Sequence, residues 1–347
     1  MTFTEKQLAL RSKGIGGSEI AAVLGLNPKV TPFDVWARKV GALEEQEHDR
    51  DPVGNLPAYL GTRLEPVVAD VYAARHPEIL LVGSDTYQHP EFPWAIVTPD
   101  REAYRVPAEN PAGMAGIQPS DRDHLVEIKT KSWRTAREFG ESGTDELPAD
   151  VLCQAQWQAL IVGVALVRVA VLIDGRDYRE YEVQADKDLH AIMLEKGGEF
   201  WNGYVLPRVE PPLVGRAAKQ YLAQKFRMHG QEILRADPMA DDTLRRLLNV
   251  RAELTEAEAR KEALENALKA LIGTNKGIQG EVAKVTWSQT KDAEIVDWKA
   301  VASRYRHIIE SQEWETDVQS EIDGIVADHT TIRAGSRRFL FQAAKED

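Results

Sequence analysis

Hydrophobic residues in the N-terminal part of the chain recur every three or four positions, which is the period of an amphipathic helix. The clearest run lies in residues 60–75. Thr31 followed by Pro32 is a typical helix start, since proline fits the first helical position. This pattern predicts N-terminal helices at residues 4–12, 17–25, 32–40 and 60–75.

The pattern changes after residue 78, where short β-rich runs are bounded by proline, glycine or aspartate. The apolar run 165–173 (ALVRVAVLI) is typical of a strand buried on both faces. The order of elements predicts an α/β (α+β) fold, in which a mixed sheet is flanked by helices. Strands are expected at 79–88, 94–98, 124–130, 165–173 and 178–183, and helices at 149–162 and 186–205.

From residue 213 the chain becomes mostly helical, so the sequence predicts a core of residues 1–212 and a C-terminal extension of residues 213–347. Apolar positions between Leu247 and Leu271 alternate three and four residues apart, with Lys261 as the charged interruption. This seam fits an oligomer zipper or a helical hairpin that packs on its own chain, and the hairpin is favoured because helix bundles use the same period. Strands at 279–289 and 336–342 are expected to form a terminal β-hairpin.

Composition and charge narrow the class of protein. The 347 residues are 43% hydrophobic and carry a formal net charge of −12, which argues against a protein that passively coats DNA. Residues 129–137 nevertheless form a local basic stretch, in which Lys131 and Arg134 are expected to contact DNA. The single cysteine excludes an intramolecular disulfide, and neither a signal pattern nor a membrane-spanning apolar run is seen. A cytoplasmic protein is therefore expected.

Residues 125–129 (LVEIK) are the sharpest chemical pattern in the chain. In a strand, Glu127 and Lys129 share one face, about 7 Å apart, while Val126 and Ile128 point into a core on the other face. A carboxylate can hold Mg²⁺, and a neighbouring lysine can orient or deprotonate a water that attacks a phosphodiester. The pattern thus indicates metal-dependent phosphodiester hydrolysis.

Two further carboxylates complete the predicted site. Asp100 follows the apolar strand 94–98, and the intervening Pro99 cannot donate to a sheet, so Asp100 is free to turn towards a ligand. Glu65 lies on the predicted helix 60–75 and supplies a third acid. A second Asp-x-Lys pattern, at residues 297–299, has the spacing of a helix start and is set aside.

These motifs together resemble the YqaJ/lambda-exonuclease branch of the PD-(D/E)xK nucleases. They occur in the order typical of that family between residues 10 and 210. The matching pieces are Arg11 with 14–21 (GIGGSEIA), 24–28 (LGLNP), 61–66 (GTRLEP), 98–100 (TPD), 127–129 (EIK), Pro148 followed by 154–156 (QAQ), and Phe200-Trp201 before Pro207. The resemblance implies a restriction-endonuclease-like sheet in the core.

The resemblance also implies roles for residues at the matching positions. Asp100, Glu127 and the carbonyl of Ile128 would bind Mg²⁺, with Mn²⁺ as a substitute ion, and Glu65 would complete the site. Lys129 would act on the attacking water, and Gln156, in preference to Gln154, would lie beside the metal. Arg11 and Ser18 match a pocket for a 5′-phosphate. A long loop, 106–121, precedes the Glu127 strand, and Asp121 and Asp123 remain alternatives to Asp100 as the aspartate ligand.

By resemblance, the expected activity is 5′→3′ digestion of linear double-stranded DNA by a phage or prophage protein in a bacterial cell. The implied partners are DNA ends, a single-strand annealing recombinase and further copies of the chain in a ring. A restriction-like endonuclease and an inactive DNA-end-binding scaffold are the alternatives. The glycine-rich segment 14–17 lacks the Lys-Ser/Thr of a P-loop, and the histidines lack the spacing of zinc ligands, so an ATPase or zinc enzyme is not expected.

Overall fold

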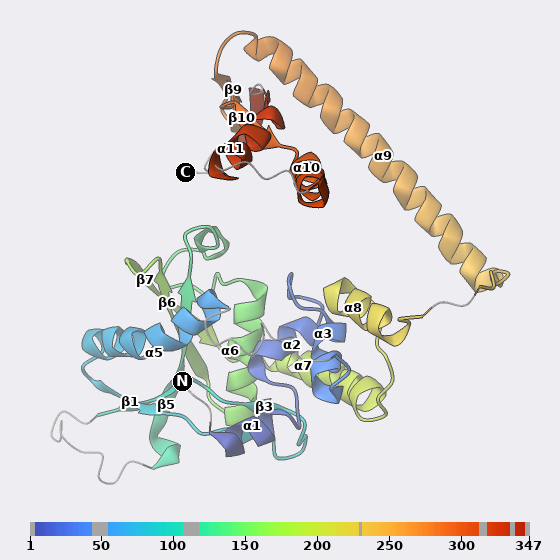
Figure 1. Cartoon of the computed structure of the whole chain (residues 1–347). Coiled ribbons are helices and arrows are strands. Elements are labelled where there is room, and N and C mark those ends of the chain that lie inside the picture. Colours follow the sequence, from blue (N-terminus) through green and yellow to red (C-terminus); the bar gives the residue numbers. More distant parts are fainter. Residues whose placement is uncertain are drawn as a thin grey trace. The chain divides into compact units, whose positions relative to one another are not determined.

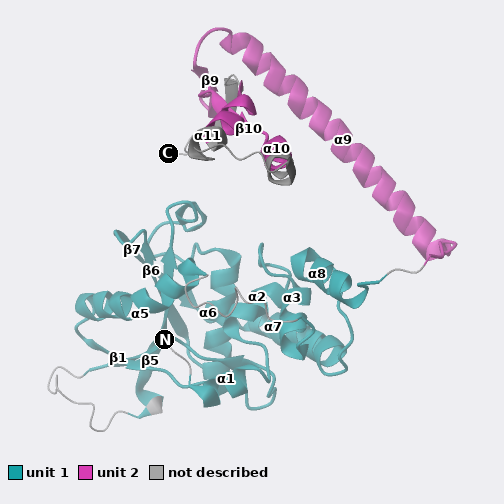
Figure 2. Ribbon diagram, viewed as in Figure 1, with its two compact units in different colours: residues 1–230 teal, residues 231–347 magenta. Residues whose placement is uncertain are grey.

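The computed structural model describes residues 4–43, 55–106, 118–228, 231–311, 318–333 and 337–343. The chain forms two compact units, residues 1–230 and 231–347 (Figure 1 and Figure 2). The first unit extends beyond the expected boundary at residue 212, because helix α8 (Gly215–Lys225) buries Ala217 and Ala218 in the same core as Phe33. No helix within the described ranges is long and apolar enough to span a membrane.

A five-stranded mixed sheet forms the centre of the first unit, in the order β1-β4-β5-β6-β7. β5 and β6 are parallel, and the other neighbours are antiparallel. The mixed α/β architecture predicted from the hydrophobic pattern is therefore confirmed. The strands are β1 (Ile79–Gly83), β4 (Arg101–Arg105), β5 (Arg122–Lys131), β6 (Leu166–Ile173) and β7 (Asp177–Gln184).

Helices cover both faces of this sheet. Helix α5 (Leu56–Arg75) packs on one face, where Val68 and Tyr72 meet Val126 and Ile128. Helix α6 (Ala149–Val162) makes the crossover from β5 to β6 and packs on the opposite face. A further apolar core joins α6 to α2 (Gly17–Val23), α3 (Pro32–Val40), α7 (Lys187–Phe200) and the π-helix Trp201–Val205. Helix α1 (Glu5–Arg11) precedes them and buries no residue.

Three strands of the first unit differ from the prediction. The predicted strand 79–88 is divided into β1 and β2 (Tyr87–Gln88). β4 (sequence REAYR) was not predicted, because its charged residues hide the alternation of apolar and polar positions that is typical of a strand. Its Glu102 is nevertheless buried, since Ser84, Tyr87, Tyr104 and Arg122 all donate hydrogen bonds to it. The predicted strand 94–98 is β3 (Ile96–Val97), which pairs with β2 (Tyr87–Gln88) outside the five-stranded sheet.

The second unit contains more β-structure than expected. β9 (Ala283–Gln289) pairs antiparallel with β12 (Arg337–Ala343), but β10, α10, α11 and β11 separate them in sequence, so the predicted terminal hairpin is wrong. Asp297 caps helix α10 by accepting hydrogen bonds from the Lys299 and Ala300 amides, as expected for a helix start. The other elements are α9 (Pro238–Ile272), β8 (Gly277–Gln279), β10 (Ala293–Val296), α10 (Trp298–Ser311), α11 (Val318–Asp328) and β11 (Thr330–Arg333).

The predicted helical hairpin is also wrong. α9 is a single helix of 35 residues, and within its unit it packs against β8 and β9 near its C-terminal end. The leucines of its seam are exposed, apart from the half-buried Leu268. The same sequence period thus gives a helix whose apolar stripe faces outward.

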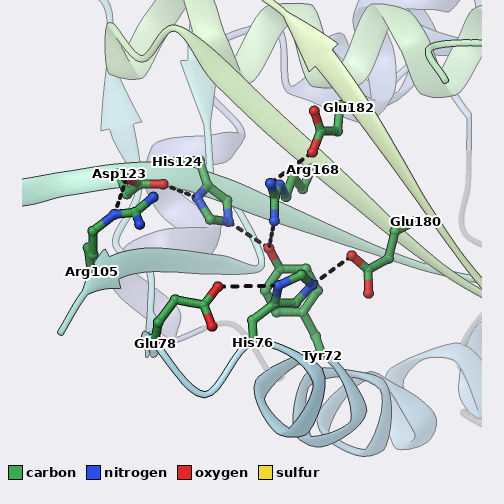
Figure 3. Close-up of polar contacts among 9 residues, drawn as sticks. All are labelled: Tyr72, His76, Glu78, Arg105, Asp123, His124, Arg168, Glu180 and Glu182. Carbon is green, nitrogen blue, oxygen red and sulfur yellow. Dashed lines mark hydrogen bonds and ion pairs between the residues drawn. The ribbon is translucent and has the colours of Figure 1, made fainter. Parts of the chain in front are cut away.

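A polar network fixes α5 to the sheet (Figure 3). The Tyr72 hydroxyl lies 2.7 Å from Nε2 of His124, whose Nδ1 lies 2.8 Å from Asp123. Burial raises the pKa of Tyr72 to about 12 and lowers the pKa of His124, so both groups are neutral near pH 7. Arg168 donates to the same hydroxyl at 3.4 Å. Nε2 of His76, the residue that follows α5, lies 2.7 Å from Glu180. These contacts hold the helix that carries Glu65.

We expect Tyr72→Phe to lower the free energy of unfolding by about 1–3 kcal/mol, because it removes the hydroxyl that lies against Nε2 of the buried His124 and leaves that nitrogen without this partner. Urea denaturation measures this change. Tyr59→Phe is the matched control, since Tyr59 lies at the other end of α5 and is partly exposed. Equal effects of the two substitutions would show that the network contributes no stability.

Candidate active site

Most of the predicted site residues meet at a cavity of about 370 Å³ in the first unit. Its walls come from the end of α1, the start of α2, the N-terminal half of α5, the end of β3 with the segment before β4, the C-terminal half of β5 and the second turn of α6. Segments far apart in the sequence are therefore brought together here. The cavity is lined by Arg11, Ser18, Glu65, Asp100, Glu127, Ile128, Lys129, Lys131 and Gln154, among others.

Glu127 is the most enclosed acid of the site, with 2% of its surface exposed. It projects from β5 on the α6 side of the sheet, and Lys129 follows on the same side, as predicted. The Lys129 ammonium donates to Oε1 of Glu127 at 2.6 Å and to Oε1 of Gln154 at 2.8 Å. The amides of Gln154 and Gln158 also donate to the Glu127 carboxylate. Glu127 thus accepts three side-chain hydrogen bonds.

Lys129 keeps its proton in this setting. Desolvation lowers its pKa, but the neighbouring carboxylates of Glu127 and Asp100 outweigh that effect, so the pKa lies above its ordinary value. In this arrangement Lys129 is a cation and a hydrogen-bond donor. It is suited to neutralise charge on a phosphate and to orient a water molecule, and less suited to remove a proton.

Asp100 lies immediately before β4. Its Oδ2 accepts a hydrogen bond from the amide of Ile128 at 2.8 Å, which places its carboxylate next to that of Glu127. Desolvation and the Glu127 charge raise the pKa of Asp100 to about 8, although Lys129 and the Ile128 amide act in the opposite direction. Two adjacent carboxylates in a poorly solvated place attract a cation.

Glu65 lines the same cavity but has a different partner. It reaches the cavity from α5, on the face of the sheet opposite Glu127, and accepts a hydrogen bond from Arg101 at 2.8 Å. Among the residues that the structure describes, no three His, Cys, Asp or Glu side chains are arranged to hold a metal ion. The acidic centre is therefore the pair Asp100 and Glu127, with Glu65 nearby.

The placement predicted for Gln156 is wrong. Its amide donates to the Gln184 carbonyl at 2.8 Å, and its Oε1 accepts from the Asp186 amide and lies 2.8 Å from Nε2 of His190. It therefore faces away from the carboxylates. Residues four apart share a helix face and residues two apart do not, so Gln154 and Gln158 reach Glu127 instead. Sequence reasoning missed Gln158, although its i,i+4 spacing from Gln154 is visible in the sequence.

Arg11 and Ser18 lie in the cavity, although both are far upstream in the sequence. Burial lowers the pKa of Arg11, while the charges of Glu19, Asp100 and Glu127 raise it, so Arg11 lies within reach of the acidic pair. Gly14 permits this arrangement. Ile15 donates to the Trp94 carbonyl at 2.6 Å, and a Cβ at Gly14 would lie 2.3 Å from the same oxygen.

The remaining predicted residues divide into two groups. Lys131 lines the cavity, whereas Arg134 lies outside it, exposed and 5.7 Å from the ring of Trp133. Asp121 and Asp123 also lie elsewhere, since Asp121 accepts from the Gln118 amide and Asp123 from Arg105. Asp100 is thus the aspartate beside Glu127. Residues 107–117 of the long loop lie outside the described residues.

The family model of the YqaJ-like viral recombinase domain matches residues 6–165, a range that includes every residue lining the cavity. Residues 6–165 are a YqaJ-like viral recombinase domain. Uncharacterized protein YqaJ of Bacillus subtilis (strain 168) is 26% identical over 269 residues, or 76% of this chain and 77% of that protein. The family expected from the motifs is thereby confirmed.

Solved structures show more distant similarity. An alkaline exonuclease (LHK-Exo) from Laribacter hongkongensis aligns with a TM-score of 0.41 and 17% identity, over 64% of this chain and 97% of that chain. A phage related exonuclease from Haemophilus somnus 129PT aligns with a TM-score of 0.35 and 12% identity, over 57% of this chain and 96% of that chain. The family assignment of the YqaJ-like domain rests on its sequence.

We expect Asp100→Asn to raise the melting temperature of the metal-free protein at pH 8 and to change it little at pH 4. Because the folded-state pKa is above the ordinary value of 3.8, the stability contributed by the protonated group is present below about pH 4 and is lost as pH rises towards about 8. Asparagine keeps an acceptor for the Ile128 amide and carries no charge.

Thermal melts in EDTA between pH 4 and pH 8 test this expectation. Asp70→Asn is the control, because Asp70 is exposed on α5. If Asp100→Asn lowers the melting temperature at pH 8, the two carboxylates do not repel each other as described.

Proposed function

We propose that this protein is a Mg²⁺-dependent exonuclease that digests one strand of linear double-stranded DNA in the 5′→3′ direction. The observation that carries the proposal is the meeting of Asp100, Glu127 and Lys129 in one cavity with Arg11 and Ser18. The YqaJ-like viral recombinase domain that holds this cavity supports a role in DNA recombination. The 3′ strand left behind would serve a single-strand annealing protein in a bacterial cell.

The donor set fits Mg²⁺. Asp100 and Glu127 supply carboxylate oxygens and Ile128 a backbone carbonyl, and Mg²⁺ in proteins commonly uses one or two carboxylates together with water and substrate phosphate. The raised pKa of Asp100 also supports a cation site here, because a cation would relieve the repulsion between the two acids. When bound, Mg²⁺ supplies positive charge to the phosphate and to the attacking water. Mn²⁺ has similar ligand preferences.

The protein's own residues have separate tasks in this proposal. Lys129, held by Glu127 and Gln154, donates hydrogen bonds to the reacting phosphate or to the water. Arg11 and Ser18 bind the terminal 5′-phosphate, since a guanidinium can make paired charge-assisted hydrogen bonds with phosphate oxygens. Lys131 extends the positive charge along the cavity. Glu65, paired with Arg101, assists the acidic pair from the α5 side.

We expect the protein to release mononucleotides from linear duplex DNA in Mg²⁺ and to leave covalently closed circles intact. Lys129→Ala should abolish hydrolysis while DNA binding is mostly retained, because it removes a cation from the cavity and keeps both carboxylates. Lys299→Ala is the matched control, since Lys299 is exposed in the other Asp-x-Lys sequence. Gel and nucleotide-release assays measure both effects.

Nicked or linearised circles would identify an endonuclease and contradict the proposal. Full activity of the Lys129 variant would show that Lys129 is not a catalytic residue.

We expect a preference for 5′-phosphorylated over 5′-hydroxyl ends, and Arg11→Ala should remove most of it. The loss corresponds to about 1.5–3 kcal/mol if one charge-assisted contact to the phosphate is lost. Single-turnover rates on both substrates measure it, with Arg216→Ala on the exposed side of α8 as the control. Equal rates on the two ends in the unmodified protein would leave the 5′-phosphate pocket without support.

A further inference from the structure

Helix α9 is drawn in Figure 1. Its sequence carries an apolar stripe that repeats every seven residues. Most of the stripe is exposed: Leu254 by 58%, Leu264 by 68% and Leu271 by 70%, whereas Leu268 is half-buried. An apolar groove follows its C-terminal half, between Ala257 and Leu271. Counted from Leu247, positions a and d of consecutive heptads are Leu247, Val250, Leu254, Ala257, Lys261, Leu264, Leu268 and Leu271.

Such a regular stripe indicates a partner helix of matching period. A residue range of 247–271 corresponds to about 36 Å of helix, long enough for a stable coiled coil. The residues on the stripe and along its edges differ in size and charge. They therefore determine which partner helix fits.

A parallel pairing of two copies of α9 is unfavourable. In that arrangement each core residue meets its own equivalent, so two Lys261 ammoniums would share one layer and two Ala257 side chains would leave a gap in the next. The edges conflict as well. Residues at g of one copy and at the following e position of the other would be adjacent, which brings Arg246 next to Arg251 and Glu253 next to Glu258. Only the third such pair, Arg260 with Glu265, joins opposite charges.

An antiparallel pairing of two copies removes both core conflicts and reduces the number of like-charge contacts at the edges. Lys261 of one copy then lies opposite Ala257 of the other, where the small side chain leaves room for the lysine stem and the ammonium can reach solvent. Lys261 already lies 3.6 Å from Glu265 of its own helix, which neutralises it there. The layers outside this pair are all apolar, namely Leu247 with Leu271, Val250 with Leu268, and Leu254 with Leu264.

The edges also fit this pairing better. Arg251 of one copy faces Glu265 of the other, and the contact occurs twice by symmetry. Like charges meet at the midpoint, where Glu258 and Arg260 each face their own equivalent in the other copy. The stripe of one α9 therefore fits an antiparallel copy of α9 better than a parallel copy.

We propose that α9 forms an antiparallel coiled coil with α9 of a second copy of this chain, over residues 247–271. The resulting dimer carries two YqaJ-like domains. This interaction is independent of the proposed nuclease activity.

The oligomeric state of the full-length protein tests the proposal, measured by sedimentation equilibrium. We expect a dimer, and we expect Leu254→Glu to raise its dissociation constant at least about a hundredfold, since it places a charge in two core layers of the pair. Leu248→Glu is the control, because Leu248 is 63% exposed at position b, beside the stripe. Circular dichroism confirms that both variants keep their helices.

A monomer at all concentrations would overturn the proposal. A stripe that packs against the rest of its own chain would give that result. A dimer that is equally stable with Leu254→Glu would place the interface elsewhere and overturn it too.

Disulfide formation tests the orientation, in a background with the buried Cys153 replaced by alanine. A mixture of Leu254→Cys and Leu264→Cys proteins should form the mixed disulfide, because these positions are opposite each other in the antiparallel pair. Leu254→Cys alone should form little disulfide. Efficient self-linking of Leu254→Cys without the mixed product would mean a parallel pair and would overturn the proposed orientation.

Discussion

The candidate site depends on the carboxylate of Glu127, which is held inside the protein between β5 and α6. A buried carboxylate is unfavourable unless its oxygens accept hydrogen bonds. Lys129, Gln154 and Gln158 donate those bonds, and they come from the same two elements that enclose the carboxylate. The position of α6 on the sheet and the charge arrangement of the site are therefore set by one group of contacts.

Asp100 adds a second carboxylate beside the first, and this pairing works against stability in the absence of a cation. The fold keeps it in place through the Ile128 amide and through the pairing of β4 with β5. Strain of this kind is common where residues are placed for chemistry, and it is offset elsewhere in the structure. The buried contacts of Glu102 in β4 and of Tyr72 on α5 stabilise the two elements that bring Asp100 and Glu65 to the cavity.

The two units differ in how their hydrophobic residues are used. In the first unit, apolar side chains from helices and strands meet in shared cores on both sides of the sheet. In the second, α9 presents its leucines outward. The same three-and-four spacing therefore has different consequences, because period describes a helix face and not the surface that covers it.

The sequence by itself determined the features that depend on local geometry. The bounds of α3 and α6, the buried strand β6 and the common face of Glu127 and Lys129 all follow from the fixed period of a helix or a strand. Tertiary structure decided what depends on contacts between distant segments. It paired β4 with β5 although charges hide its alternation, turned Gln154 and Gln158 towards Glu127 and Gln156 away, and brought Arg11 into the cavity. Period states which residues share a face, but only packing selects which face meets which neighbour.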